Sequence, residues 1–169
     1  MQPRKNIPTL LKALASLNRP NLDLVLAGAK GWQYDEIFSQ VDSLGLVNRV
    51  HSIGYVQDEE LPFWYNAAKA LVFPSVYEGF GIPIVEAMAC GTPVIAARSS
   101  SISEAGGEAA LYFDPLDAEN LVQQLNNILS DESLVDRMQH SGFEQARNFS
   151  WERAGLETSQ VYAMTLADR

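Results

Sequence analysis

The residues that most directly suggest chemistry are two glutamates, Glu78 and Glu86, with seven residues between them. The intervening segment holds Gly79 and Gly81, followed by Pro83, and it comes directly after an apolar, strand-like run. Glycine lets the backbone turn sharply or approach a ligand, and proline suits the first turn of a helix. The pattern therefore predicts a strand, a glycine turn and a helix N-terminus, whose free N–H groups and dipole attract anions.

The two acids are expected on either side of this anion site. Glu78 lies before the turn, and Glu86 is predicted in the first turn of the helix, so that both can face one crevice. Two carboxylates beside an anion site predict a ligand that carries both hydroxyls and phosphates. A nucleotide sugar fits that description.

The stretch resembles the Glu-x7-Glu signature of retaining nucleotide-sugar glycosyltransferases with the GT-B fold, the glycosyl transferases group 1. Further segments resemble the same family in the expected order; they are 3–6, 26–28, 50–56, 87–96 and 149–152. The resemblance covers nearly the whole chain and corresponds to the C-terminal, donor-binding domain. It implies that residues 1–169 form one α/β domain, a Rossmann-like, doubly wound parallel sheet flanked by helices, as in the C-terminal half of a GT-B fold.

Composition narrows the classes of function. With 169 residues, the chain is long enough for one sizeable core. A net charge of −9 argues against a nucleic-acid surface, which needs a basic stripe. A single cysteine excludes an internal disulfide and suits a reducing compartment, and Cys90 is interpreted as a small buried hydrophobe. We expect a cytoplasmic location, with peripheral association with the inner membrane left open for the full-length enzyme.

Helical and strand patterns alternate along the chain, as in a parallel sheet covered by helices. The predicted strands are 22–27, 49–53, 70–73, 92–96 and 110–113. The predicted helices are 6–17, 34–44, 58–67, the one that begins at 83, 116–130, 132–147 and 151–166. Asn6 and Asp58 are the expected side-chain caps of two of these helices.

One element of the family pattern is not found. The family places a strand that ends in a glycine before its Arg-Lys motif, whereas this chain starts at Met1. In a sheet ordered 3-2-1-4-5-6 that first strand is central. We therefore expect either a gap between strands 22–27 and 70–73 or a rearranged N-terminus. On this interpretation the chain is a fragment without its N-terminal acceptor domain, inactive on its own, with an exposed sheet edge that favours self-association.

The resemblance assigns catalytic roles to Arg4, Lys5 and Glu78. Arg4 and Lys5 would supply positive charge to the donor's diphosphate and stabilise it as it leaves, in place of a metal. The alternative is a solvated pair near the terminus. Glu78 would lie by the donor sugar, either to bind hydroxyls or to support an oxocarbenium-like state, and the alternative is a loop carboxylate in water. Replacing Glu78 with alanine is expected to leave the binding of bare GDP or UDP nearly unchanged.

The remaining expected contacts bind the nucleotide. Glu86 would accept hydrogen bonds from both ribose hydroxyls, the alternative being a first-turn glutamate that only complements the helix dipole. Backbone groups at the glycine turn would meet the sugar and the distal phosphate, and a strand-end loop would meet the base. These further donor-binding residues are Gly28, Tyr55, Val56, Gly79, Phe80, Gly81 and Ile82.

Several other side chains that often mark functional sites are interpreted as structural. His51 falls in a predicted strand without a nearby metal-ligand partner, and His140 falls on a helix face with acids four residues away on either side. The tryptophans Trp32, Trp64 and Trp151 are expected to pack rather than to bind sugars.

The predicted function is the donor-binding half of a retaining glycosyltransferase. It would move a sugar, first mannose from GDP-mannose or else the sugar of a UDP-sugar, to a glycan or lipid-linked acceptor held by the missing domain, with no metal or other cofactor. The motifs look most like those of bacterial mannosyltransferases of polysaccharide assembly. The alternative is a non-catalytic nucleotide-sugar binding or regulatory module. A dehydrogenase-type dinucleotide domain is disfavoured because its glycine fingerprint is absent.

Overall fold

The computed structural model describes residues 2–29, 34–99 and 101–167. The described strands form two parallel ladders. In the first, β1 (Leu24–Ala27) pairs with β2 (Val50–Gly54). In the second, β3 (Leu71–Phe73), β4 (Val94–Ala97) and β5 (Leu111–Phe113) follow one another in that order. The parallel pairing confirms the predicted α/β class.

The sheet is interrupted between β1 and β3. Within the described part of the chain, no strand is hydrogen-bonded to both ladders. The N-terminal segment does not supply one, because Pro3–Lys5 forms a short 3₁₀ helix, η1, which leads directly into α1 (Ile7–Ser16). The interruption falls between the two strands where the sequence predicted a gap.

Strand β4 shows how the two faces of its ladder are covered. All four of its residues are buried, as in a central strand of a parallel sheet. Ile95 and Ala97 belong to one buried apolar cluster, whereas Val94 and Ala96 belong to a second one. Because successive strand residues point to opposite faces, the two clusters lie on opposite sides of the ladder.

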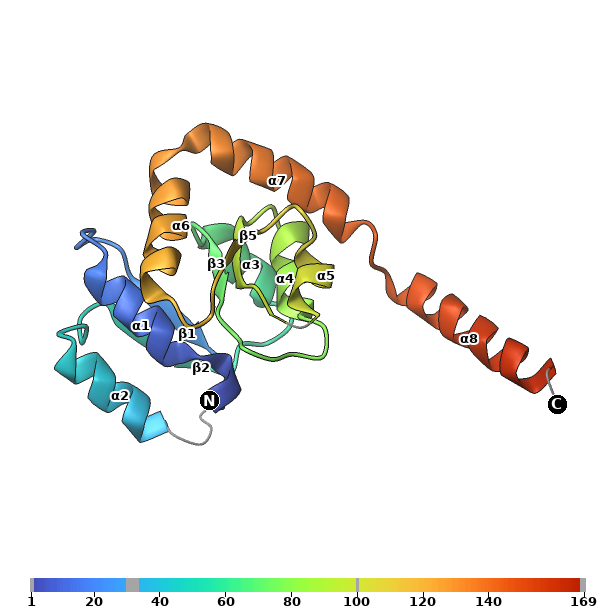
Figure 1. The fold of residues 1–169 in the computed structure, drawn as a ribbon, viewed down its shortest axis with the longest axis horizontal. Helices are drawn as coiled ribbons and strands as arrows, with labels where there is room; N and C mark the ends of the chain where they lie inside the picture. The colour runs from blue at the N-terminus through green and yellow to red at the C-terminus, as the bar shows by residue number, and fades with distance from the viewer. Residues whose placement is uncertain (1, 30–33, 100, 168–169) are drawn as a thin grey trace.

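The first cluster joins the two ladders into one core. It contains Leu11 of α1, Leu26 of β1, Ile95 of β4 and Leu121 of α6 (Ala118–Ser130). Helices α1 and α6 pack against each other and lie side by side in Figure 1. The interruption in the sheet is therefore bridged by apolar side chains of this shared core.

Other helices build the second cluster. It contains buried side chains of α4 (Ile82–Ala89) and α5 (Ile102–Gly106). Helix α7 (Glu132–Ala146) packs on α4, where Gly142 approaches Met88 closely enough that an added Cβ would lie 3.4 Å from its Cγ. These contacts hold α4, the helix after the glycine turn, firmly against the ladder.

Some predicted element boundaries were wrong. Asn6 occupies the N-cap position of α1 in a left-handed conformation but makes no capping hydrogen bond. Its side-chain oxygen accepts instead from the Thr9 hydroxyl at 2.8 Å, and its amide donates to the carbonyl of Pro115 at 2.7 Å. Helix α3 (Leu61–Ala67) begins three residues after Asp58 and has no side-chain cap. Helix α5 was not predicted. Helix α2 (Tyr34–Ser43), which packs on α1 and places Ile37 and Val41 in the first cluster, agrees with its prediction to one residue.

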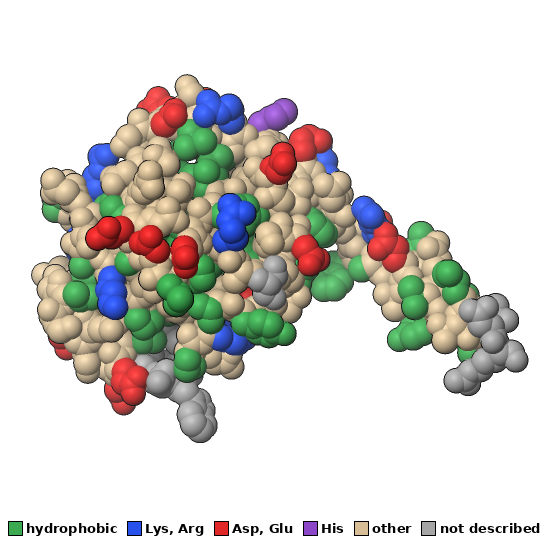
Figure 2. All heavy atoms as spheres, in the orientation of Figure 1, with side chains coloured by type: hydrophobic (Ala, Val, Ile, Leu, Met, Phe, Trp, Pro, Cys, Tyr) green, Lys and Arg blue, Asp and Glu red, His purple; other side chains and the backbone are tan. Residues whose placement is uncertain are grey.

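The last helix, α8 (Trp151–Ala167), extends away from the body of the protein (Figure 1). Trp151 is 82% exposed and Trp64 is 42% exposed, so neither is the packing residue that the sequence suggested. Trp32 lies outside the described residues. Large apolar side chains remain exposed along α8, as the green spheres of the arm in Figure 2 show. No helix in the described ranges is long and apolar enough to cross a membrane.

Candidate functional site

The structure brings the N-terminal basic pair onto the first signature glutamate. The ammonium of Lys5 donates to Oε1 of Glu78 at 2.7 Å, and the Arg4 guanidinium pairs with Oε2 of the same carboxylate. The two segments are also joined through the backbone, since the N–H of Val76 donates to the carbonyl of Arg4 at 2.8 Å. Charge-assisted contacts of this kind are among the strongest hydrogen bonds in proteins. They fix η1 beside the loop that follows β3.

The exposure of these side chains argues against the alternatives of a solvated basic pair and a solvent-exposed loop carboxylate. The side chain of Glu78 is only 12% exposed, so it is not a loop carboxylate in water. Arg4 and Lys5 are 40% and 37% exposed, and the ammonium of Lys5 also lies 5.2 Å from the centre of the Phe73 ring. Both side chains are therefore paired with Glu78 and still partly accessible to solvent. With two cations against one anion, the cluster keeps a net positive charge in an acidic protein.

The surroundings of Glu78 also change its acidity. Partial burial alone would raise the pKa of this carboxyl, but Lys5, the Ser75 hydroxyl and Arg4 outweigh it, and its pKa lies below the ordinary value. The Ser75 hydroxyl is fully buried and makes no hydrogen bond of good geometry within the described residues. We therefore treat it as a dipole near the carboxylate, and the two cations as the donors that keep Glu78 ionised.

The glycine turn leaves a row of backbone donors at the start of α4. Gly81 has a left-handed backbone, with φ of 107°, and it occupies the N-cap position of the helix. In the described residues, nothing accepts a hydrogen bond from the backbone N–H groups of Phe80, Gly81 or Ile82. Adjacent free N–H groups at a helix N-terminus form a favourable site for an anion. This is the geometry that the sequence predicted for the turn.

Two serines that were not predicted hold this turn in place. Ser101 donates from its hydroxyl to the carbonyl of Glu78 at 2.8 Å, and Ser99 donates to the carbonyl of Ser75 at 3.0 Å. Both come from the serine run after β4, which the sequence showed without indicating its partner. The side chain of Phe80 is likewise structural, because its ring meets Phe149 edge-on at 5.2 Å.

Glu86 lies in the second turn of α4, not the first as predicted, and no acid lies in the first turn. The predicted alternative, a glutamate that only complements the helix dipole, is therefore wrong. The half-buried carboxylate accepts a hydrogen bond at Oε2 from the hydroxyl of Tyr65, at 2.9 Å. Its other oxygen, Oε1, accepts none from the described residues. Glu86 therefore presents one held and one available oxygen.

Gly28, expected near the ligand, and Tyr55 and Val56, expected to meet the base, lie at the carboxyl end of the first ladder. Gly28 donates from its backbone N–H to the carbonyl of Gly54 at 2.7 Å, which joins the carboxyl ends of β1 and β2. Beyond Gly54, the side chain of Tyr55 is 65% exposed, whereas Val56 is buried. Val56 can therefore offer only its backbone to a ligand, while the ring of Tyr55 is accessible.

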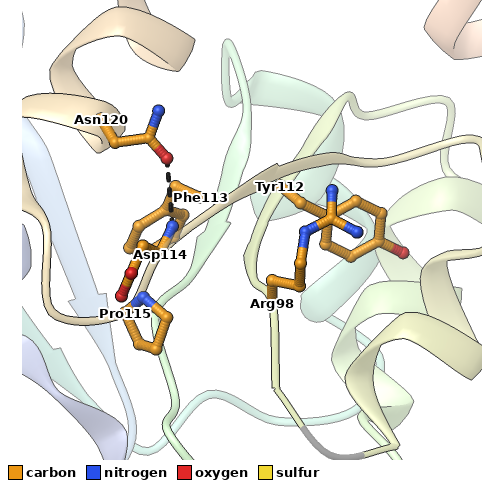
Figure 3. A pocket seen from close by; sticks show the side chains of 6 residues that line it. All are labelled: Arg98, Tyr112, Phe113, Asp114, Pro115 and Asn120. Atoms are coloured by element: carbon orange, nitrogen blue, oxygen red, sulfur yellow. Dashed lines mark hydrogen bonds between the residues drawn. The ribbon is translucent and has the colours of Figure 1, made fainter.

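A separate cavity of about 520 Å³ lies at the carboxyl ends of β4 and β5, and it does not coincide with the predicted site. Figure 3 shows its lining, in which the Arg98 guanidinium stacks 4.8 Å from the Tyr112 ring and the backbone N–H of Asp114 donates to Asn120. None of the predicted site residues lines it. Pro115 on its rim accepts hydrogen bonds at its carbonyl from the side chains of Asn6, at 2.7 Å, and Thr9, at 3.4 Å.

The remaining candidate side chains have structural surroundings. His51 pairs with Asp23 at 3.3 Å on the surface of the first ladder, and His140 is exposed on α7. Cys90 is half-buried rather than fully buried, and burial together with nearby Glu86 raises the pKa of its thiol. Within the described ranges, no three His, Cys, Asp or Glu side chains gather as they would around a metal ion.

The fold and the predicted site residues define a parallel α/β domain with a positively charged cluster and a helix N-terminus at one strand end. Residues 1–145 match the family described as "Glycosyl transferases group 1". The chain belongs to this family, as its signature segment suggested.

Relatives and solved structures agree with this assignment. The chain is 39% identical, over 97% of its length, to the O-antigen chain mannosyltransferase B of Escherichia coli. It superposes with a TM-score of 0.85 on Anabaena HepE in complex with UDP-glucose, at 28% identity and over 100% of this chain. It also matches the C-terminal domain of the group 1 glycosyltransferase LpcC from Francisella tularensis, with a TM-score of 0.76, 25% identity and 88% of this chain covered.

The shares of the matched proteins differ. The chain spans 44% of the mannosyltransferase and 47% of the HepE chain, but 80% of the LpcC domain structure. The architecture is that of a C-terminal GT-B domain.

Proposed function

We propose that this chain is the donor-binding half of a retaining glycosyltransferase, which transfers a sugar from a nucleoside-diphosphate sugar to a glycan or lipid-linked acceptor. The observation that carries the proposal is the arrangement around Glu78. Arg4 and Lys5 lie against its carboxylate, and the free N–H groups at the start of α4 follow in the same loop. Positive charge and free backbone donors together suit a diphosphate.

In this proposal, the basic pair and the α4 N-terminus hold the diphosphate and stabilise the charge that develops as it leaves. Since these groups supply positive charge themselves, we propose that no metal is required. Glu78 stands beside the donor sugar, where its carboxylate binds hydroxyls or supports an oxocarbenium-like state. Glu86 accepts from the ribose through its available oxygen, and Tyr55 with the backbone of Val56 meets the base.

The choice of donor rests on the relatives. The 39% identity to an O-antigen chain mannosyltransferase supports mannose, and hence GDP-mannose, as the first donor to test. The HepE complex with UDP-glucose supports a UDP-sugar as the second. Because the chain spans less than half of these proteins, we propose that the acceptor is bound by a further N-terminal domain. The single cysteine supports a cytoplasmic location.

Calorimetry with GDP and UDP, with and without EDTA, tests the binding part of the proposal. We expect weak binding of a nucleoside diphosphate that is unchanged by EDTA. Loss of binding on addition of EDTA would contradict the metal-free proposal, and no binding of either nucleotide would contradict the assignment of the site.

The alternative is a non-catalytic nucleotide-sugar module. It predicts binding without transfer both in this chain and in the product of the complete reading frame. The proposed enzyme predicts transfer by the complete product with GDP-mannose or a UDP-sugar, and little or none by this chain alone. Measuring sugar release from the donor in both proteins separates the two functions.

A further inference from the structure

Tyr65 connects the helix after β2 to the second signature glutamate. Its hydroxyl donates to Oε2 of Glu86 at 2.9 Å, from α3 to α4. We propose that Tyr65 is a positioning residue, which holds one oxygen of the Glu86 carboxylate and thereby directs the other at the ribose of a bound nucleotide. The inference rests on the proposed role of Glu86 and goes beyond it, because no role for Tyr65 was predicted from the sequence.

The geometry fixes Tyr65 itself. Its ring is half-buried and packs against the apolar cluster that contains Ile84 and Met88 of α4. Its backbone carbonyl accepts a hydrogen bond from the hydroxyl of Thr92 at 2.8 Å, just before β4. The ring and backbone of Tyr65 are thus anchored to two elements, and its hydroxyl meets Glu86 at a defined place.

The hydrogen bond can run in only one direction. An ionised carboxylate only accepts hydrogen bonds, while a phenol can donate. Burial, together with the neighbouring Glu86, raises the pKa of Tyr65 well above its ordinary value, so the hydroxyl remains protonated and donates. A glutamate side chain has several rotatable bonds. The Tyr65 contact selects one arrangement before a ligand arrives, and such preorganisation increases affinity.

A purely structural role would have the same appearance, because buried hydroxyls generally need a partner. The two roles differ in what they do to the ribose. If Tyr65 acts through Glu86, then loss of its hydroxyl weakens only nucleotides that have ribose hydroxyls for Glu86 to bind. If Tyr65 only supports the fold, then loss of its hydroxyl weakens every nucleotide to the same extent.

The test uses this chain, calorimetry and four probes: GDP, UDP and their 2′,3′-dideoxy analogues. Tyr65→Phe removes the hydroxyl and keeps the ring. Tyr112→Phe is the matched control, since it removes a hydroxyl that donates to the Gly107 carbonyl at 2.8 Å, away from Glu86. Melting temperatures of both variants are measured, so that a general loss of structure is seen directly.

Of GDP and UDP, the probe that binds the unmodified chain more tightly is used for the comparison. We expect Tyr65→Phe to lower the affinity for this nucleotide about three- to tenfold, the scale of a lost hydrogen bond. The dideoxy analogue of that nucleotide should bind Tyr65→Phe and the unmodified chain with equal affinity. Tyr112→Phe should bind both the nucleotide and its dideoxy analogue with the affinity of the unmodified chain. An equal loss for the ribose and dideoxy probes, or no loss for either, would overturn the positioning role.

The outcome for Glu86 separates this inference from the proposed function. If Glu86→Ala discriminates between ribose and dideoxy probes but Tyr65→Phe does not, then Glu86 binds the ribose without help from Tyr65 and only the further inference fails. If Glu86→Ala does not discriminate between them, then the ribose role of Glu86 fails and the positioning role fails with it.

Discussion

If Arg4 and Lys5 bind the diphosphate of a donor as proposed, the carboxylate of Glu78 and the phosphates would compete for the same two cations. Both Arg4 and Lys5 pair with the Glu78 carboxylate. A diphosphate that approaches this cluster must therefore share these cations with Glu78 or displace it. On the proposed function, the charge of Glu78 would therefore oppose the binding of a bare nucleotide, whatever it contributes at the sugar.

This geometry changes the sequence-based expectation that Glu78 does not affect bare nucleotide. We predict that Glu78→Gln binds GDP or UDP more tightly, by about two- to tenfold, because partly exposed charges interact modestly. Glu132→Gln is the matched control, with the same change in net charge on the first turn of α7. Calorimetry at low salt is the measurement, and equal affinities in the two variants would show that Glu78 does not compete for the cations.

The same carboxylate should make stability depend on pH. Its pKa is lowered in the folded protein, so its ionised form stabilises the fold above the unfolded pKa of about 4.3. That contribution is lost as pH falls through the lower, folded pKa. We predict that the melting-temperature difference between the natural chain and Glu78→Gln is constant from about pH 5 to 7 and vanishes at lower pH. A difference that persists undiminished at the acid end would contradict the ion-pair assignment.

Individual contacts at the site were beyond what the sequence could predict. The segments that hold Lys5 and Glu78 are 73 residues apart, and no local pattern encodes their meeting. The family resemblance did indicate that both serve one ligand. Tyr65 was missed for a similar reason: its sequence context shows only a helix, and its contact with Glu86 exists because α3 packs on α4.

At the scale of elements, the two glycines of the signature turn differ in backbone conformation and in the space around them. Gly81 has φ of 107° and is buried, and a Cβ there would lie 3.2 Å from Cδ1 of Ile84. Gly79 does not have a positive φ, and a Cβ there would meet no atom within 4 Å. The sequence-based prediction gave both glycines the same role in the turn.

We predict that Gly81→Ala destabilises the protein by about 1–3 kcal/mol, the usual cost of a strained backbone conformation. Gly79→Ala should stay within about 0.5 kcal/mol, as for an unstrained surface change. Urea denaturation of both variants measures the difference. Equal stabilities would mean that the left-handed turn at the start of α4 is not required by the fold.

Element prediction succeeded where periodicity was strong. Each strand was located to within two residues, because each is a short apolar run bounded by turn residues. Prediction failed where tertiary contacts, rather than the local sequence, determine the structure. Asn6 looked like a helix cap, but its side chain bonds to Pro115, which is 109 residues away. Helix α5 has only five residues, too few to show a helical period.

At the scale of the whole molecule, two surfaces without a partner among the described residues bear on stability and association. One is the interruption between the two ladders, where β1 and β3 each present an unpaired edge. The other is α8, which projects from the body with exposed apolar side chains (Figures 1 and 2). The overall fold class followed from the alternation of helix and strand, and the interruption followed from the family pattern of strands.

The unpaired edges lead to the last prediction. Backbone donors and acceptors that are buried without partners each cost about 1–3 kcal/mol, so the chain should self-associate or be only marginally stable. We predict that a ten-residue upstream extension with a family-like strand sequence raises the melting temperature, by about 2–4 °C for each kcal/mol gained. It should also reduce self-association, measured by sedimentation. A Gly/Ser extension of equal length is the control, because it adds chain without strand propensity. A strictly monomeric chain whose melting temperature does not rise with the strand extension would show that the edge backbone groups of β1 and β3 already have hydrogen-bond partners.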